Sequence, residues 1–489
     1  MRRLFITAMV ALGAILILSG TALAQPKPEF KMGFKSLSDQ IPAIVGEPVE
    51  DEQSSPSGDS LQRTTRGLMV WRKVDNWTAF TDGQFTWVVG PTGVQRRLNA
   101  ERFPWEAREM VVGALVSLTG SWSSLGESSA LAADLAQEDI NGYLAEIGSK
   151  TRLRVEVRDT KLDPAAALAG MQELASLGAR VVVGPQSSSE AATVKPFADE
   201  NSILVVSQSS TAGSLAEPDN LFRFTPNDAL EGQAIAALMG EDGIEFVVPV
   251  WRADAGNEGL QIATRRSLEA MGAKMAEGVR YDATTQDFGP VVAALLLQVN
   301  QAVEQNGAKS VGVYLAGFDE VTSLFNRAQS EAALGAVRWY GSDGVALSEV
   351  LARNAQAASF AARVGYPNPI FGLDVRAREK WEPLSNRMSA VLGREPEAFA
   401  LGVYDALWVA ALANQTVGES APFDALKQAF VQTANSYYGV TAWTGLDDAG
   451  DRVVATFDYW VVREEGGAFR WVRVARYDGT PGSEAKVLR

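Results

Sequence analysis

The sequence contains neither cysteine nor histidine among its 489 residues. Without cysteine the chain forms no disulfide and carries no lipid on an N-terminal cysteine, so its stability must come from burial alone. Without histidine, Ser-His-Asp and Cys-His catalysis and histidine-ligated metal sites are excluded, and the commonest general base near neutral pH is missing. An enzyme would have to rely on carboxylates, so we expect a protein that is not an enzyme and needs no cofactor or metal.

Basic residues are also in the minority. The formal net charge is −15 and the sequence pI is about 4.8, whereas nucleic acids and anionic membranes attract surfaces rich in lysine and arginine. Neither Gly-x-Gly-x-x-Gly nor Gly-x4-Gly-Lys-Ser/Thr follows an expected strand, so nucleotide binding is unsupported as well. We expect no nucleic-acid partner.

The first residues have the three parts of a secretory signal peptide. Arg2 and Arg3 precede an apolar run over 4–18, and the small-residue stretch 21–24 follows. The alternative is a retained membrane anchor, but the run is shorter than the roughly 20 residues that a spanning helix needs. We therefore expect cleavage after Ala24, no stable membrane insertion afterwards, and a periplasmic or extracellular protein that is soluble.

The next segments differ in composition. Residues 25–63 are rich in Pro, Ser, Asp and Glu, which predicts a linker or disordered arm. Over 64–106, aromatic and β-branched runs flank the Asp-Gly pair at 82–83, which is a strong hairpin signal and predicts a small β-rich module. Its tryptophans, Trp71, Trp77 and Trp87, either bind a sugar or partner or form a small core.

From Arg108 onward, short apolar strands alternate with helices. Expected strands lie at 111–116, 155–157, 180–184, 203–206, 246–250, 311–315 and 337–340. The helix over 163–178 has an aspartate cap, a proline in its first turn and a glycine past its end. This alternation predicts parallel sheets covered on both faces, and because one sheet would be overlong, two lobes. We expect an α/β protein with two doubly wound parallel-sheet lobes preceded by the small β-rich module.

Three loops after first-lobe strands are rich in hydroxyl groups. They cover 117–122, 184–190 and 207–212, and ligands bind beyond the carboxyl ends of strands in open α/β sheets. Hydroxyls and helix N-termini at that edge suit a carboxylate. The alternative for a single loop is helix capping, because Ser187 and Glu190 fit a capping box.

Residues from about 109 to 478 resemble the type I periplasmic binding proteins of the leucine/isoleucine/valine-binding family, which feed ABC transporters. The matching stretches lie at 113–120, 125–126, 138–142, 159, 163–164, 184–189, 207–211, 215, 222–226 and 404–407. The resemblance implies a ligand cleft between two lobes joined by three crossovers. It implies lobe 1 over 107–228 with about 361–440, lobe 2 over 229–360 with about 441–480, and a tail over 481–489.

The resemblance also implies roles for individual residues. The hydroxyl that grips the ligand's α-carboxylate falls on Ser187, and the carbonyl and hydroxyl that serve the ammonium and carboxylate fall on Ser209 and Thr211. The acid that pairs with the ammonium falls on Asp343, and an aromatic over the ligand falls on Phe318. From the residues alone, Asp343 before a glycine is nearly as well explained as a turn former.

Two positions depart from the family's pattern. Leu125 stands where the family often has an aromatic residue, with Trp122 three residues earlier as a substitute at the ligand, and Gly256 stands at a second aromatic position. These changes would enlarge the pocket or alter the ligand class. The β-rich module has no counterpart in ordinary transporter receptors.

The function expected from these observations is an extracytoplasmic receptor that binds an amino-acid-like ligand, branched-chain amino acids among the candidates, and delivers it to an ABC transporter permease. Three alternatives stay open. One is a sensor that reports the same ligand to a signalling partner, and another is an envelope scaffold with a vestigial pocket. The third is an enzyme that uses aspartate and glutamate alone.

Overall fold

The computed structural model describes residues 27–55, 58–73, 76–99, 101–103, 105–106, 108–453, 456–479 and 486–488. The expected signal peptide and its cleavage site lie outside these residues. The chain divides into two compact units that meet between Arg108 and Glu109, within two residues of the expected boundary. Among the described residues, no helix combines the length and the apolar character that crossing a membrane requires.

The first unit contains a six-stranded antiparallel sheet in sequence order. Its elements are α1 (Met32–Gln40), α2 (Pro42–Val45), β1 (Gln53–Ser54), β2 (Ser60–Arg63), β3 (Leu68–Arg72), β4 (Trp77–Thr81), β5 (Phe85–Gly90) and β6 (Gly93–Leu98). The Asp82-Gly83 pair joins β4 to β5, and Gly83 has φ +97, a conformation that favours glycine. The expected hairpin is therefore confirmed.

The prediction of a linker or disordered arm over 25–63 is wrong for the described residues. Phe34 and Leu37, three residues apart on α1, pack into a core with Met69 and Phe80 of the sheet. This i,i+3 apolar pair buries one face of a short helix, and the polar composition around it concealed that signal.

The tryptophans of the first unit support the small-core interpretation. Trp71 and Trp87 pack against the core beneath α1. The rings of Trp77 and Trp105 lie 4.7 Å apart between centroids, which is within the range of favourable aromatic pairs. All four side chains are half-buried.

In the second unit, lobe 1 has a five-stranded sheet in the order β11-β10-β9-β7-β8. Its first elements are β7 (Arg108–Val116), α3 (Ser123–Glu146), β8 (Thr151–Asp159), α4 (Pro164–Ser176), β9 (Val181–Val183), α5 (Ser188–Glu200), β10 (Leu204–Ser207) and β11 (Leu221–Arg223). β9 pairs in parallel with both β7 and β10, and β10 with β11. The cap of α4 is as expected, because the Asp163 side chain accepts a hydrogen bond from the backbone N–H of Ala166.

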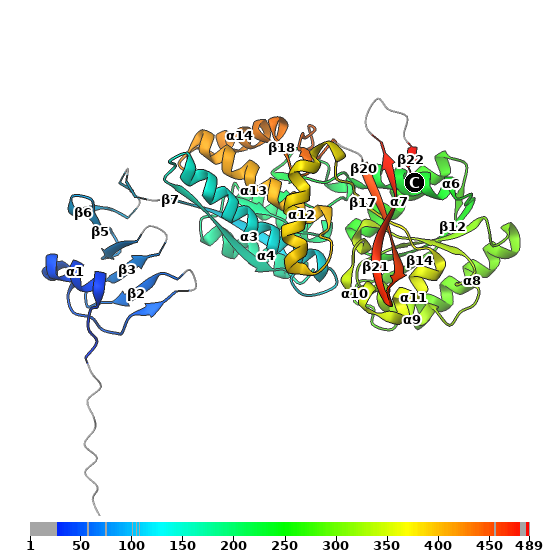
Figure 1. Ribbon diagram of the computed structural model, residues 1–489, viewed down its shortest axis with the longest axis horizontal. Coiled ribbons are helices and arrows are strands. Elements are labelled where there is room, and N and C mark those ends of the chain that lie inside the picture. The colour runs from blue at the N-terminus through cyan, green and yellow to red at the C-terminus, as the bar shows by residue number, and fades with distance from the viewer. Residues whose placement is uncertain are drawn as a thin grey trace, which may run out of the picture. The chain divides into compact units, whose positions relative to one another are not determined.

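Lobe 1 is completed by helices that come much later in the chain. These are α12 (Arg378–Leu392), α13 (Ala398–Val417) and α14 (Phe423–Ser436), followed by the short strands β18 (Tyr438–Gly439) and β19 (Ala442–Trp443). α13 packs against α3 and buries fourteen of its residues. Figure 1 shows α3, α12 and α13 together in lobe 1, although α3 is far from the other two in sequence.

Lobe 2 has a parallel sheet in the order β13-β12-β15-β16, with β14 also paired to β12. Its elements are α6 (Asp228–Glu241), β12 (Phe246–Ala253), α7 (Ala255–Ala270), β13 (Lys274–Met275), β14 (Val279–Asp282), α8 (Gly289–Asn306), β15 (Val311–Ala316), α9 (Val321–Ala328), β16 (Arg338–Tyr340), α10 (Glu349–Arg353) and α11 (Ala355–Val364). The two parallel-sheet lobes of the predicted fold class are confirmed.

A four-stranded sheet links the lobes. It consists of β17 (Asn368–Phe371), β20 (Thr456–Glu465), β21 (Ala468–Asp478) and β22 (Lys486–Leu488), with antiparallel neighbours. Figure 1 shows the long strands β20 and β21, in red, lying along lobe 2. The chain passes between lobes at three places: between β11 and α6, at β17, and at the start of β20. β22 lies within the expected tail over 481–489, so part of that tail is a strand.

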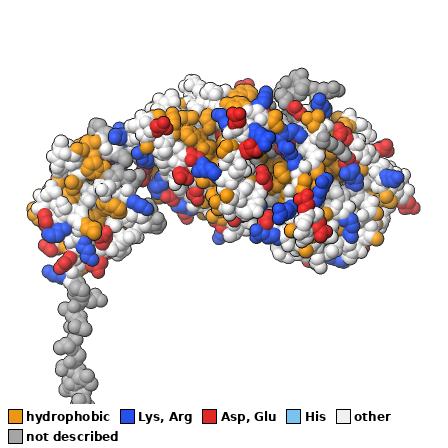
Figure 2. All heavy atoms as spheres, viewed as in Figure 1, with side chains coloured by type: hydrophobic (Ala, Val, Ile, Leu, Met, Phe, Trp, Pro, Cys, Tyr) orange, Lys and Arg blue, Asp and Glu red, His pale blue; other side chains and the backbone are white. Residues whose placement is uncertain are grey.

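Two lobe boundaries differ from the expected ones. α11 packs in the core of lobe 2 through Phe360 and Ala361, so lobe 2 extends past residue 361. Residues 441–453 belong with lobe 1, because the Arg452 guanidinium donates to the carbonyl of Phe224 and to the Thr441 hydroxyl. On the face drawn in Figure 2, acidic and basic side chains are interspersed over both units.

Candidate functional site

Three first-lobe loops reach the same edge of the sheet, as the sequence predicts. Trp122 lies after β7, Ser187 after β9, and Ser209 and Thr211 after β10. Parallel strands place these loops side by side at their carboxyl ends. All four side chains line one small cavity, and each is less than a tenth exposed.

Lobe 2 closes the cavity from the other side. Its contributions come from the start of α7, from the loop after β15 and from the turn after β16. The lining residues are Trp122, Ser187, Ser188, Ser209, Thr211, Gly256, Asn257, Leu260, Phe318 and Asp343. The structure therefore brings all six residues predicted for the site to one cavity.

The lobes are in direct contact around this cavity. The rings of Trp122 and Phe318, from opposite lobes, lie 4.6 Å apart between centroids. The backbone N–H of Asp319 donates to the carbonyl of Ser121 at 2.8 Å, and that of Glu349 donates to the Ser124 hydroxyl at 3.0 Å. The cavity measures about 20 Å³, room for little more than a water molecule. The cleft is closed in this conformation.

The hydroxyl side of the cavity is built on helix starts. Ser187 caps α5: its hydroxyl donates to Glu190 Oε2 at 2.6 Å and accepts the Glu190 N–H at 3.3 Å. The predicted capping box is present, and Ser187 lines the cavity as well. The Ser209 hydroxyl donates to the carbonyl of Gln186 at 2.9 Å, which ties two of the loops together.

Two helices begin at the cavity, one from each lobe. α5 begins at Ser188 and α7 at Ala255, and both present N–H groups and the positive end of the helix dipole. The N–H of Ala255 donates across the cleft to the Ser189 hydroxyl at 3.2 Å. A carboxylate between these helix starts would meet favourable charge from both.

The opposite side of the cavity is acidic. Asp343 begins the short turn Asp343–Val345, as the turn-former interpretation also predicts, and its backbone N–H donates to Glu231 Oε1 at 3.0 Å. Glu231 and Asp228 lie on the first turn of α6, and all three carboxyl groups are buried. Asp343 lines the cavity, and the other two are not among the lining residues.

Burial controls the protonation of these acids. Loss of water raises the pKa of Asp228 to about 7 and that of Asp343 to about 6, and it raises the pKa of Glu231 well above its usual value. A hydrogen bond from the Thr211 hydroxyl partly offsets this effect and lowers the pKa of Asp228. Near neutral pH, Asp343 is therefore the member of the group that most readily carries charge beside the cavity.

Phe318 is held in place by a charged neighbour. The Arg252 guanidinium lies 5.3 Å from the centroid of the Phe318 ring, within the range of cation–π contacts. Arg252 also makes ion pairs with Asp254 at 2.8 Å and Glu320 at 3.4 Å. The aromatic wall on the lobe 2 side thus packs against a guanidinium that is itself held by two carboxylates.

The two departures from the family's pattern have different consequences. Leu125 is fully buried in lobe 1 and does not line the cavity, whereas Trp122 does. Gly256 lines the cavity, and a Cβ there would meet the Ser188 hydroxyl at 3.5 Å, an ordinary contact.

Over the described part of the chain, no cluster of three or more acidic side chains could hold a metal ion.

Glu231 and Asp228 were missed by sequence reasoning. Their positions in Asn227-Asp228-Ala229-Leu230-Glu231 are explained by the preference for acids in a helix's first turn, so nothing marked them as cleft residues. The clue was their place directly after the first crossover, where α6 begins at the cleft.

Comparison with protein families gives a match to one model, described as the receptor family ligand binding region, over residues 128–462. A curated relative is an uncharacterized protein of Methanocaldococcus jannaschii, 29% identical over 76% of this chain and 90% of the relative. Another is the leucine-, isoleucine-, valine-, threonine-, and alanine-binding protein of Pseudomonas aeruginosa, 24% identical over 70% of this chain and 87% of the relative.

Solved structures share the fold of the second unit. The branched-chain amino acid transporter substrate binding protein LivJ from Streptococcus pneumoniae, in complex with isoleucine, superposes with a TM-score of 0.61 at 21% identity. The match covers 75% of this chain and all of that protein.

Proposed function

Because this chain belongs to the family of receptor ligand binding regions, with the type I periplasmic-binding-protein fold, we propose that it is an extracytoplasmic solute-binding receptor for an amino-acid-like ligand. The family binds ligands and does not catalyse reactions. Its relatives include branched-chain amino acid binding proteins. The ligand class, the extracytoplasmic location and the partner of this chain are proposals that go beyond its family.

The observation that carries the proposal is the opposite chemistry of the two sides of the cleft. Hydroxyls and helix starts, around Ser187 and Thr211, suit a carboxylate. Across the cavity, Asp343 suits an ammonium group, and the carbonyl of Ser209 is a further acceptor for it. An α-amino acid carries these two charges on neighbouring groups.

Aromatic rings supply the apolar part of the site. Trp122 and Phe318 would cover the ligand's side chain from opposite lobes. Since a ligand that contacts both lobes favours only the closed conformation, binding and closure are coupled. The cleft opens to admit the ligand, because the cavity of about 20 Å³ holds no amino acid.

Delivery to an ABC transporter permease is the second part of the proposal. It is supported by the transporter named for the S. pneumoniae protein and by the signal-peptide pattern at the start of the sequence. The sensor alternative shares the binding site and differs only in the partner. A permease gene beside this one would favour transport, and a signalling gene would favour the sensor.

The first experiment is mass spectrometry of the small molecule that co-purifies with the native protein, followed by titration calorimetry with that molecule. Truncating one partner of a buried hydrogen-bonded charge pair costs about 2–5 kcal/mol, so Asp343→Ala should weaken binding by about 30-fold to several thousand-fold. Thr211→Ala should cost less, because a neutral hydroxyl bonded to a charged group contributes about 1.5–3 kcal/mol.

Asp287→Ala is the matched control, because Asp287 is exposed and lies outside the cavity lining. It should bind as the unmodified protein does. If Asp343→Ala also binds unchanged, the ligand has no ammonium group, and a small carboxylate or amide replaces the amino acid in the proposal.

A further inference from the structure

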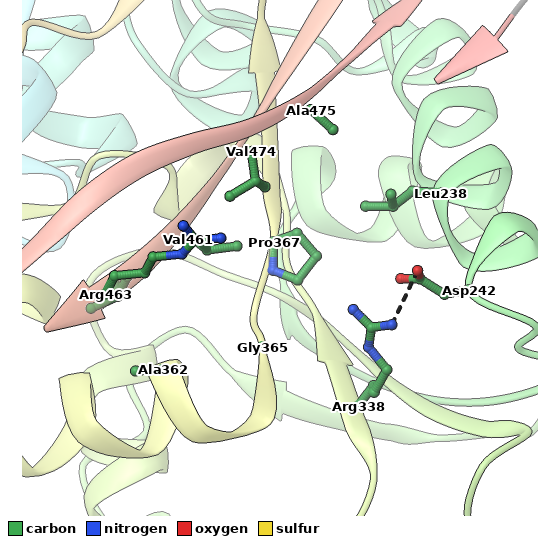
Figure 3. Close-up of a pocket in the computed structure, with 11 residues that line it drawn as sticks. Leu238, Asp242, Arg338, Ala362, Gly365, Pro367, Val461, Arg463, Val474 and Ala475 are labelled. Atoms are coloured by element: carbon green, nitrogen blue, oxygen red, sulfur yellow. Dashed lines mark ion pairs between the residues drawn. The ribbon is translucent and has the colours of Figure 1, made fainter. Parts of the chain in front are cut away.

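Lobe 2 contains a second, larger cavity. It measures about 280 Å³ and shares no lining residue with the cleft. Figure 3 shows it between the end of α6, the end of α11 and the strands β20 and β21. Its lining residues are Leu238, Asp242, Arg338, Ala362, Gly365, Pro367, Val461, Val462, Arg463, Val474 and Ala475.

One wall of the cavity is apolar. Leu238, Pro367 and Ala475 are buried side chains from three different elements. An engineered apolar cavity of about 150 Å³ accommodates benzene, so this one has room for a compact organic molecule. The wall favours a ligand with an apolar body.

An ion pair lies beside this apolar wall. Arg338 lies 3.0 Å from Asp242 Oδ1, and the Tyr340 hydroxyl donates to Asp242 Oδ2 at 3.0 Å. The dashed line in Figure 3 marks the ion pair. The Asp242 charge is thus balanced by Arg338, and a guanidinium has five N–H donors, more than this contact uses.

Arg463 brings a further positive charge. In Figure 3 its side chain extends toward Pro367. Among the described residues, no carboxylate lies within ion-pair distance of it, and its partner across the β20–β21 ladder is Arg470, a like charge. Like charges directly opposite each other are unfavourable, so an anion beside Arg463 would relieve the repulsion.

We propose that this cavity is a second binding site, which takes a small organic anion: a carboxylate or phosphate group on a compact apolar body. The anionic group lies between the guanidinium groups of Arg463 and Arg338, which bind planar or tetrahedral anions through paired donors. The apolar body lies against Leu238, Pro367 and Ala475.

The site is separate from the cleft but shares one helix with it. α6 carries Glu231 and Asp228 at the cleft end and Leu238 at the cavity end, where Asp242 directly follows its last residue. Because the two sets of lining residues are disjoint, a ligand in this cavity does not compete with the cleft ligand. One protein molecule should therefore bind one ligand in the cleft and one in this cavity at the same time.

The test is titration of the full-length protein with phenyl phosphate, followed by calorimetry, with inorganic phosphate as the second probe. We expect phenyl phosphate to bind more tightly than inorganic phosphate, because only the former fills the apolar wall. Arg463→Ala should weaken the binding of phenyl phosphate by up to about fivefold, because Arg463 is exposed and an exposed ion pair contributes about 0.2–1 kcal/mol.

Arg353→Ala is the matched control: it removes an exposed arginine of lobe 2 that does not line this cavity. It should leave phenyl phosphate binding unchanged. Ala362→Phe, on a half-buried position of α11, should fill the cavity and abolish binding. The proposal is overturned if phenyl phosphate fails to bind, if Arg353→Ala weakens its binding as much as Arg463→Ala does, or if Ala362→Phe still binds it.

Discussion

At the scale of single residues, the most consequential feature is the group of buried acids beside the cleft. Asp228, Glu231 and Asp343 lie close enough to raise one another's pKa or to share a hydrogen bond. A buried carboxylate without a cation is costly, so such groups take up protons instead. A ligand's ammonium group would supply the missing cation, which is why the acids favour a cationic ligand.

These acids make stability depend on pH in an unusual direction. Asp228 has a folded pKa of about 7 against 3.8 for the ordinary side chain. Between these values the folded protein holds a proton that the unfolded chain lacks, so the free energy of unfolding falls as pH rises from about 4 to about 7. Ionisation of Asp228 alone lowers the free energy of unfolding by about 4 kcal/mol once the pH is above both pKa values.

The measurement is the melting temperature of the ligand-free protein at pH 5 and at pH 8, compared with that of Asp228→Asn. The amide does not ionise, so the variant should lose less stability between the two values than the unmodified protein. Asp287→Asn, at the exposed control position, should keep the original pH dependence. Equal pH dependence in all three proteins would show that Asp228 is ionised throughout.

Single residues were predictable where their role is local. Ser187 was marked by its capping box and by the loop it begins, and the structure shows both its cap and its place at the cavity. Glu231 was not predictable, because its proximity to Asp343 joins positions more than a hundred residues apart. Such a contact depends on how α6 packs beneath the turn after β16, and no local pattern records it.

At the scale of elements, one buried ion pair holds a crossover in place. Arg223, at the end of β11, makes a two-pronged contact with Asp451, and its guanidinium also donates to the carbonyl of Ala212. Both charged side chains are almost fully buried. The pair joins the first crossover to the segment before β20.

Breaking this pair should destabilise the whole second unit. Removing one partner of a buried pair leaves an uncompensated charge and costs about 3–5 kcal/mol, so we expect that loss for Asp451→Ala in urea unfolding. Arg353→Ala removes an exposed pair with Glu349 and should cost under about 1 kcal/mol. Similar losses in the two variants would contradict a structural role for the buried pair.

The strands and helices of the lobes were largely predictable from sequence. The runs at 111–116 and 311–315 are apolar and β-branched, and they became β7 and β15. The short helix α1 was not predicted, because its stability comes from Phe34 and Leu37 packing on the sheet and not from its composition. The strand β22 was missed for the same reason: it forms by pairing with β21, and its own three residues are too short a run to signal a strand.

At the scale of the whole molecule, the two compact units divide at the start of β7. Each unit has its own core, so we expect a variant that begins at Arg108 to fold and to bind the ligand within about two-fold of the full-length affinity. Calorimetry on both proteins checks this. An insoluble variant, or one that binds far more weakly, would make the first unit part of the receptor.

Closure of the cleft is the second prediction at this scale. The cavity between the lobes is too small for an amino acid, so ligand-free molecules must visit a more open form before they bind. Small-angle scattering of the variant that begins at Arg108 should show a smaller radius of gyration when ligand is saturating. An unchanged radius would indicate that the ligand does not bind between moving lobes.

The late position of α13 governs when lobe 1 can fold during synthesis. This helix buries fourteen residues in the lobe 1 core, yet it follows the entire α6–α11 stretch in the chain. A growing polypeptide therefore exposes the strands β7 to β11 long before the helix that covers them leaves the ribosome. That delay suits the export that we propose, because a precursor without a finished core can still be threaded through a narrow translocation channel.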